Sequence, residues 1–175
     1  MSKNSSAIEP VDLDDEPMFP VSGDQLSVGS RAPDFAFKTA VGEVSLTLHS
    51  LLSNGPVLLN FIKGTWCPFC QTHMGRLNKW RGQLKGKSVS SVVISNESPA
   101  IIRAWLKVHP MDFMFGSVVD PKVFSSFGVR IDDQAFARPA TFLIDSNGEI
   151  RLIHNLARGS RWESTVGHLG PAHKP

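Results

Sequence analysis

The sequence has no tyrosine, only two cysteines, and no apolar run long enough to cross a membrane. A membrane-spanning helix needs about 18 or more consecutive apolar residues, and a secretory signal needs a shorter apolar core that residues 1–20 also lack. We therefore expect no membrane span. We also expect a cytoplasmic location, or an exported one if a leader has been removed.

The scarcity of cysteine directs attention to the only pair, Cys67 and Cys70. A disulfide that closes so short a loop removes little entropy from the unfolded chain and therefore stabilises the fold little. Redox reactivity explains the pair better than a structural role does. With His73 the pair offers three of the four ligands of a zinc site, at an unusual spacing. Haem attachment needs a histidine where Gln71 stands. We expect no metal and no cofactor.

Acidic residues are absent between Glu43 and Glu97. Six cations lie in that interval, so we expect an electropositive setting for the cysteines: Lys63, Arg76, Lys79, Arg81, Lys85 and Lys87. The cations lack interleaved exposed aromatic residues, so we expect no nucleic-acid binding.

The domain organisation follows from composition. Residues 1–27 carry clustered acids, serines and prolines with little periodicity, which predicts a flexible acidic tail. The next segment, residues 28–170, has the length and apolar content of one domain, and residues 171–175 form a short C-terminal tail.

Strands and helices alternate along this domain. Strands are predicted at residues 34–38, 44–48, 56–62, 89–94, 113–119, 140–145 and 149–154. Helices are predicted at residues 49–52, 67–84, 98–108 and 160–169, with a short one starting at Asp120 and Pro121. Gly75 and Gly82 each weaken their helix by about 1 kcal/mol, so its far end should fray or kink. The fold class is α/β, with a mixed central sheet, helices on both faces and an added N-terminal hairpin.

Cys67 falls at the first turn of a helix that follows a buried strand. Unsatisfied backbone amides and the positive end of the helix dipole both favour the thiolate there. Cys70 lies one turn further along and deeper, as a resolving thiol would. Pro68 suits the first helical turn because its missing N–H is not needed. We expect Cys67 to attack a disulfide or another electrophilic sulfur or oxygen, and Cys70 to complete an internal disulfide.

Three motifs resemble a known family in the same order along the chain. They are the opening at residues 28–35, the strand, Trp-Cys-Pro-x-Cys turn and helix from residue 57 onward, and residues 138–145 followed by an Asn-Gly turn. Together they resemble the peroxiredoxin-like (AhpC/TSA) and TlpA-like branches of the thioredoxin superfamily. This resemblance implies a thioredoxin fold in which Pro139 is cis and packed against the dithiol. Trp66 is expected to cover the site.

Two departures from these relatives bear on mechanism. Asn60 occupies the place where thioredoxin carries a buried acid, so water or Lys63 would have to move the proton of the second cysteine. Gly64 occupies the position of the peroxiredoxin threonine, with Thr65 one residue away. Arg138 either matches the peroxiredoxin arginine or is an ordinary solvated cation. Histidines other than His73, among them His154, suggest no cluster and are assigned surface or packing roles.

The sequence thus predicts an oxidoreductase that performs thiol-disulfide exchange, with peroxiredoxin-like antioxidant character in cell redox homeostasis. Its substrate would be a protein or small-molecule disulfide or peroxide, and an external dithiol such as a thioredoxin or glutathione system would reduce it. One alternative is a peroxidase acting on hydrogen peroxide or organic hydroperoxides. Another is a redox-sensing module that binds partners without turnover.

Overall fold

The structure, a computed structural model, describes residues 11–12, 21–22 and 26–155. The predicted helix at residues 160–169 and the tail at residues 171–175 lie outside the described residues, as does most of the segment 1–27. Two dipeptides of that segment form strands: β1 (Val11–Asp12) pairs with β10 (Ile150–Asn155), and β2 (Val21–Ser22) pairs with β8 (Arg130–Ile131).

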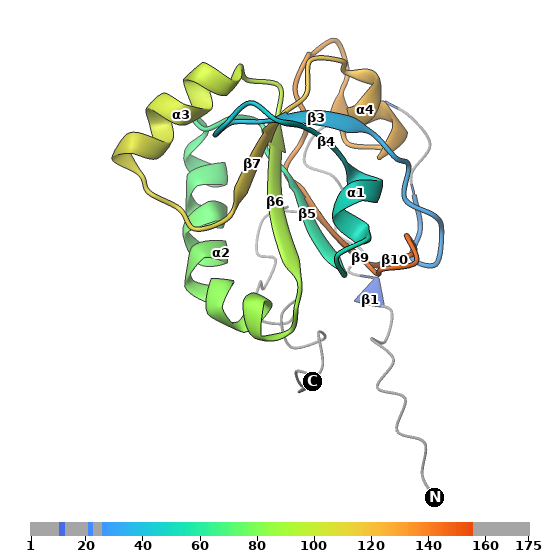
Figure 1. The fold of residues 1–175 in the computed structure, drawn as a ribbon. Helices are drawn as coiled ribbons and strands as arrows, with labels where there is room; N and C mark the ends of the chain where they lie inside the picture. The colour runs from blue at the N-terminus through green and yellow to red at the C-terminus, as the bar shows by residue number, and fades with distance from the viewer. Residues whose placement is uncertain (1–10, 13–20, 23–25, 156–175) are drawn as a thin grey trace, which may run out of the picture.

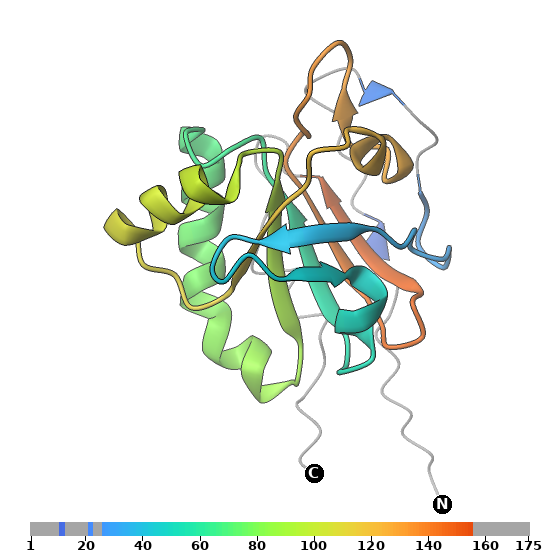
Figure 2. The same cartoon turned by 45° about the horizontal axis from the view of Figure 1, so that its top comes forward.

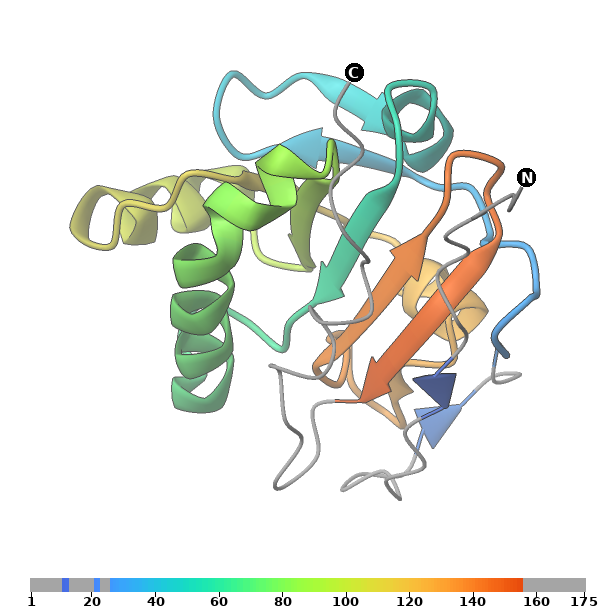
Figure 3. The ribbon, with the colours of Figure 1, turned by 90° about the horizontal axis from the view of Figure 1, so that it is seen from below.

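The main sheet of the described residues has eight strands in the order β1-β10-β9-β5-β6-β7-β3-β4. Its other members are β3 (Ala36–Thr39), β4 (Ser45–Thr47), β5 (Val57–Phe61), β6 (Ser90–Ser95), β7 (Met114–Ser117) and β9 (Ala140–Ile144). The central strand β5 runs parallel to β6 and antiparallel to β9, so the predicted mixed sheet is confirmed. Figure 3 shows β5, β9 and β10 side by side.

Helices cover both faces of this sheet, as predicted (Figure 1). One face carries α2 (Pro68–Gly86) and α3 (Pro99–Val108), and the other carries α1 (Leu48–Leu52) and α4 (Lys122–Ser126). The predicted N-terminal hairpin is also present, because β3 and β4 pair antiparallel and β3 joins the sheet through β7 (Figure 2).

The alternation of side chains along β5 creates two hydrophobic cores. Phe61 faces the α1 and α4 side, where it packs edge-on against Phe124 and Phe142 at centroid distances of 5.8 and 5.9 Å. Leu58 and Ile62 face α2 and pack with buried residues of that helix. All five residues of β5 are buried, which fits its nearly continuous apolar sequence.

The helix α2, which begins directly after Cys67, is one element through Gly75 and Gly82 to Gly86, so the predicted fraying before that residue is wrong. Buried side chains on both sides of these glycines anchor it, including Leu77 and Leu84, and this packing outweighs the weak propensity. By contrast, Ser98 caps α3 as predicted, since its side chain accepts a hydrogen bond from the Ile101 N–H.

Candidate active site

Cys67 is the N-cap residue of α2 and lies just beyond the carboxyl end of β5. Its backbone is extended, and Pro68 occupies the first helical turn as predicted. The residue is half-buried, so a partner can reach its sulfur, and it carries a free thiol. This thiol stands at the open end of a 19-residue helix, where the first-turn amides have no partner within the helix.

Cys70 is fully buried one turn along the same helix. Burial, with a contribution from a negative charge on Cys67, raises the pKa of the Cys70 thiol to about 12. Backbone N–H groups of Lys63 and Gly64 oppose this increase, the former donating to the Cys70 sulfur at 3.4 Å. The two thiols therefore differ strongly: one is accessible at a helix end, and the other is enclosed and held in its protonated form.

An aromatic surface flanks Cys67. Trp66 is exposed, and its ring meets that of Phe136 edge-on at a centroid distance of 6.1 Å. The ammonium group of Lys63 lies 5.5 Å from the Trp66 ring and 4.9 Å from the Phe136 ring, within the range of cation-π attraction. A Cβ atom at Gly64 would collide with the Trp66 indole, so the exposed ring can lie in this position only because residue 64 is a glycine.

Thr65 is buried and bound to an acid that the sequence places far away. Its backbone N–H and its hydroxyl each donate a hydrogen bond of 2.8 Å to the carboxylate of Glu97. The expected electropositive setting is thus wrong in part, because folding brings a carboxylate to within two residues of Cys67. Glu97 lies three residues after the end of the predicted strand 89–94, and nothing in the sequence indicates Thr65 as its partner.

The loop before β9 contains the remaining two predicted site residues. It lies at the same end of the sheet as the cysteines, because Ala140 is in register with Phe61. No described peptide bond is cis, so the expected cis bond before Pro139 is wrong. The trans isomer is the intrinsic preference of such a bond, by about 0.5–1 kcal/mol.

Arg138 is 6% exposed, which excludes the solvated cation. Its guanidinium donates to the Gly128 carbonyl at 3.4 Å, and burial lowers its pKa.

A buried polar cluster beneath α2 was not predicted. Asn60, Thr141 and His154 occupy adjacent positions across β5, β9 and β10, and His73 approaches them from α2. The side-chain oxygen of Asn60 accepts from the Thr141 hydroxyl at 2.9 Å and lies 3.3 Å from the Nε2 atom of His73. Its amide nitrogen donates to two backbone carbonyls, those of Leu58 and Val92.

This cluster corrects the expectation that His154 belongs to no cluster; the residue is fully buried, which agrees with a packing role and not a surface one. Burial, together with the nearby His154 and Arg76, lowers the pKa of His73 to about 3, so His73 is neutral. The four side chains Asn60, His73, Thr141 and His154 include no carboxyl group.

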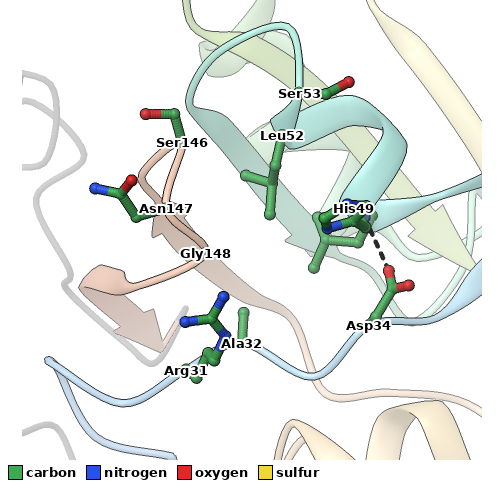
Figure 4. A pocket seen from close by; sticks show the side chains of 10 residues that line it. Arg31, Ala32, Asp34, His49, Leu52, Ser53, Ser146, Asn147 and Gly148 are labelled. Atoms are coloured by element: carbon green, nitrogen blue, oxygen red, sulfur yellow. Dashed lines mark hydrogen bonds between the residues drawn. The ribbon is translucent and has the colours of Figure 1, made fainter.

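A pocket lies at the end of β5 opposite to the dithiol. Its volume is about 340 Å³, and it lies between α1, the turn from β9 to β10 and the segment around Arg31 (Figure 4). Asp34 there accepts a hydrogen bond from the His49 backbone N–H at 2.8 Å. The lining contains no cysteine, so this pocket is separate from the dithiol.

Neither a metal cluster nor a membrane-crossing helix is found in the described part of the chain. No three His, Cys, Asp or Glu side chains there are grouped so that they could hold a metal ion. No helix there is long and apolar enough to span a bilayer.

The fold and the paired cysteines at a helix start define a thioredoxin-like protein. The model of the AhpC/TSA family matches residues 28–153, and the chain belongs to this family. Thioredoxin-like protein YneN of Bacillus subtilis (strain 168) is 30% identical over 129 residues, which are 72% of this chain and 70% of the relative. Thiol-disulfide oxidoreductase ResA of Halalkalibacterium halodurans is also 30% identical over 129 residues, covering 72% and 67%.

Solved structures agree on the fold. A peroxiredoxin-like protein from Aquifex aeolicus superimposes with a TM-score of 0.76 at 16% identity, covering 86% of this chain and 90% of the other. The family and these relatives make the chain an oxidoreductase of thiol redox chemistry.

Proposed function

We propose that this protein is a thiol-disulfide oxidoreductase in which Cys67 is the nucleophile and Cys70 the resolving thiol. The observation that carries the proposal is the difference between the two sulfurs. Cys67 is accessible at the start of α2, whereas Cys70 is buried with a pKa raised to about 12. A nucleophile must be reachable and anionic, and a resolving thiol must stay protonated until it is needed.

The reaction has two displacement steps. The Cys67 thiolate attacks one sulfur of a substrate disulfide, forms a mixed disulfide and releases the other sulfur as a thiolate. Cys67 is then uncharged, so one cause of the raised pKa of Cys70 is removed. Cys70 loses its proton to the departing thiolate or to water, attacks the Cys67 sulfur and releases the second substrate thiol. An external dithiol reduces the Cys67–Cys70 disulfide and restores the enzyme.

The surroundings support disulfides of proteins as substrates. Trp66 and Phe69 are exposed on either side of Cys67 in sequence, and Lys63 adds a cation to the aromatic surface. Such a surface can bind apolar side chains next to a substrate cysteine.

Insulin reduction in the presence of a dithiol reductant tests the proposal. The wild type should turn over, Cys67→Ser should be inactive, and Cys70→Ser should accumulate a mixed disulfide without turnover. Absence of turnover in the wild type would instead favour a redox-sensing, partner-binding module.

A second candidate function is thiol-dependent reduction of hydrogen peroxide or organic hydroperoxides. The observation in its favour is the buried guanidinium of Arg138 at the dithiol end of the sheet. Against it, both donors of Thr65 are bound to Glu97, so neither faces an incoming peroxide without exchange of partners. Stopped-flow oxidation of the reduced protein separates the two, because a rate no faster than that of free cysteine excludes a peroxidase.

A further inference from the structure

The carboxylate of Glu97 is the centre of a hydrogen-bond network that holds the turn before the dithiol. It accepts two bonds from Thr65 and a third, at 3.1 Å, from the hydroxyl of Ser95. Thr65 is 3% exposed and Ser95 is 2% exposed, so water competes little for these donors. Hydrogen bonds to an ionised acceptor are about twice as strong as neutral ones.

The carboxylate is itself held on a fixed backbone. Ser117 of β7 donates its hydroxyl proton to the Glu97 carbonyl at 2.6 Å, and the Glu97 N–H donates to the Ser95 oxygen at 3.3 Å. Ser95 ends β6, so the anchor is continuous with the central sheet. The backbone of Glu97 is therefore fixed to the sheet and not to the turn that contains Thr65.

The other side of Thr65 is tied to the helix that carries the cysteines. The Gln71 side chain donates to the Thr65 carbonyl at 2.7 Å, and the Cys67 N–H donates to the Gly64 carbonyl at 3.2 Å. Both polar backbone atoms of Thr65 are consequently occupied, one by Glu97 and one by α2. The turn is fixed between the sheet and the start of the helix.

We propose that Glu97 is a positioning residue for the dithiol: by holding Thr65 it keeps Cys67 where its sulfur can join that of Cys70. This inference rests on the proposed function. An internal disulfide forms in proportion to the effective concentration of the two thiols, which depends on how tightly the turn between sheet and helix is held. Without the carboxylate, Thr65 has two buried donors without an acceptor, and the turn leaves its position.

The test is the equilibrium of the Cys67–Cys70 disulfide with reduced and oxidised glutathione, measured on the full-length chain. Glu97→Gln and Thr65→Val should each lower the effective concentration of the dithiol by about tenfold, the effect of losing one charge-assisted hydrogen bond. The conservative variant Thr65→Ser keeps both donors and should stay at the wild-type value. Thr65→Val leaves the charge of Glu97 in place, so a decrease shared by both variants reports the lost contact and not the lost charge.

Glu43→Gln is the matched control. Glu43 is paired on the surface with Arg103 at 2.6 Å and not with Thr65, so the same change of charge should leave the equilibrium unchanged. In the double variant Glu97→Gln/Thr65→Val the effective concentration of the dithiol should fall little further than in either single variant. The two substitutions remove the same hydrogen bond, that from the Thr65 hydroxyl to the Glu97 carboxylate.

The outcomes separate the two proposals. A wild-type chain that forms no internal disulfide in any glutathione buffer would overturn the proposed function and this inference together. A wild-type disulfide that Glu97→Gln and Thr65→Val leave unchanged, or that they weaken additively, would overturn the role of Glu97 alone. Circular dichroism of the reduced variants shows whether they fold. Should Glu97→Gln not fold, the comparison of Thr65→Val with Thr65→Ser still decides.

Discussion

The hydroxyl of Thr141 donates a hydrogen bond of 2.9 Å to the side-chain oxygen of Asn60, across two strands that run antiparallel in the middle of the sheet. Asn60 is fully buried, and its amide nitrogen donates to the carbonyls of Leu58 and Val92. The amide nitrogen thus has partners that a carboxylate oxygen could not satisfy. This geometry makes the asparagine a structural part of the fold beneath the dithiol.

Asn60→Asp should therefore destabilise the protein and not restore a thioredoxin-like acid. The new carboxylate would face the carbonyl oxygens of Leu58 and Val92, which repel it. The expected loss is about 3 kcal/mol in the free energy of unfolding at neutral pH, measured by urea denaturation. The exposed Asn54→Asp is the control and should change stability by less than about 0.5 kcal/mol. A stable Asn60→Asp variant would contradict the assigned hydrogen-bond pattern.

Stability should fall in acid because of His73. Burial, with contributions from His154 and Arg76, lowers the pKa of His73 from 6.5 to about 3 in the folded state. Between these values the unfolded chain binds a proton that the folded chain does not. The free energy of unfolding should therefore decrease as pH falls from about 6.5 toward 3, by up to about 1.4 kcal/mol per pH unit from this group.

Urea denaturation at a series of pH values measures this slope. His73→Gln should flatten the dependence in that window, whereas His49→Gln, which replaces an exposed histidine, should retain it. Equal slopes in wild type and His73→Gln would show that another group is responsible.

The two cysteines should differ greatly in alkylation rate. The pKa of Cys70 is raised from 9.0 to about 12, so its thiolate fraction at neutral pH is about a thousandfold below that of an ordinary thiol. In native Cys67→Ser the contribution of Cys67 is gone but burial remains, so iodoacetamide should still modify Cys70 much more slowly than in urea-unfolded protein. Mass spectrometry of timed samples follows the reaction. Rapid modification of Cys70 in the native variant would contradict its burial.

Replacing either of two glycines within α2 should stabilise the protein. A Cβ atom at Gly75 or Gly82 would meet no heavy atom within 4 Å, and the helix is continuous through both. Gly75→Ala and Gly82→Ala should each raise the free energy of unfolding by about 0.5–1 kcal/mol. Gly64→Ala is the contrasting variant, because its methyl group would displace the Trp66 indole and alter tryptophan fluorescence. No gain in either helical variant would indicate local strain in α2.

Local patterns predicted the features that depend on neighbouring residues. Ser98 and Pro99 mark the start of α3 correctly, and the apolar run before Cys67 marks the central strand. The placement of both thiols on one helix follows from their spacing alone.

Features that depend on distant residues escaped prediction. The contact of Thr65 with Glu97 spans 32 positions, and that of Asn60 with Thr141 spans 81. A sequence pattern does not show which strands become neighbours. For the same reason the sequence did not predict that β10 would place His154 near His73 of α2.

The residue at the N-cap of α2 affects the stability of the fold. Cys67 occupies a position where serine, threonine or aspartate would accept a backbone hydrogen bond, and its own side chain makes none. Cys67→Ser should stabilise the folded state by up to about 1 kcal/mol while abolishing exchange. Selection for stability alone would therefore tend to erase this cysteine, and only a benefit from its chemistry can retain it against substitution by serine.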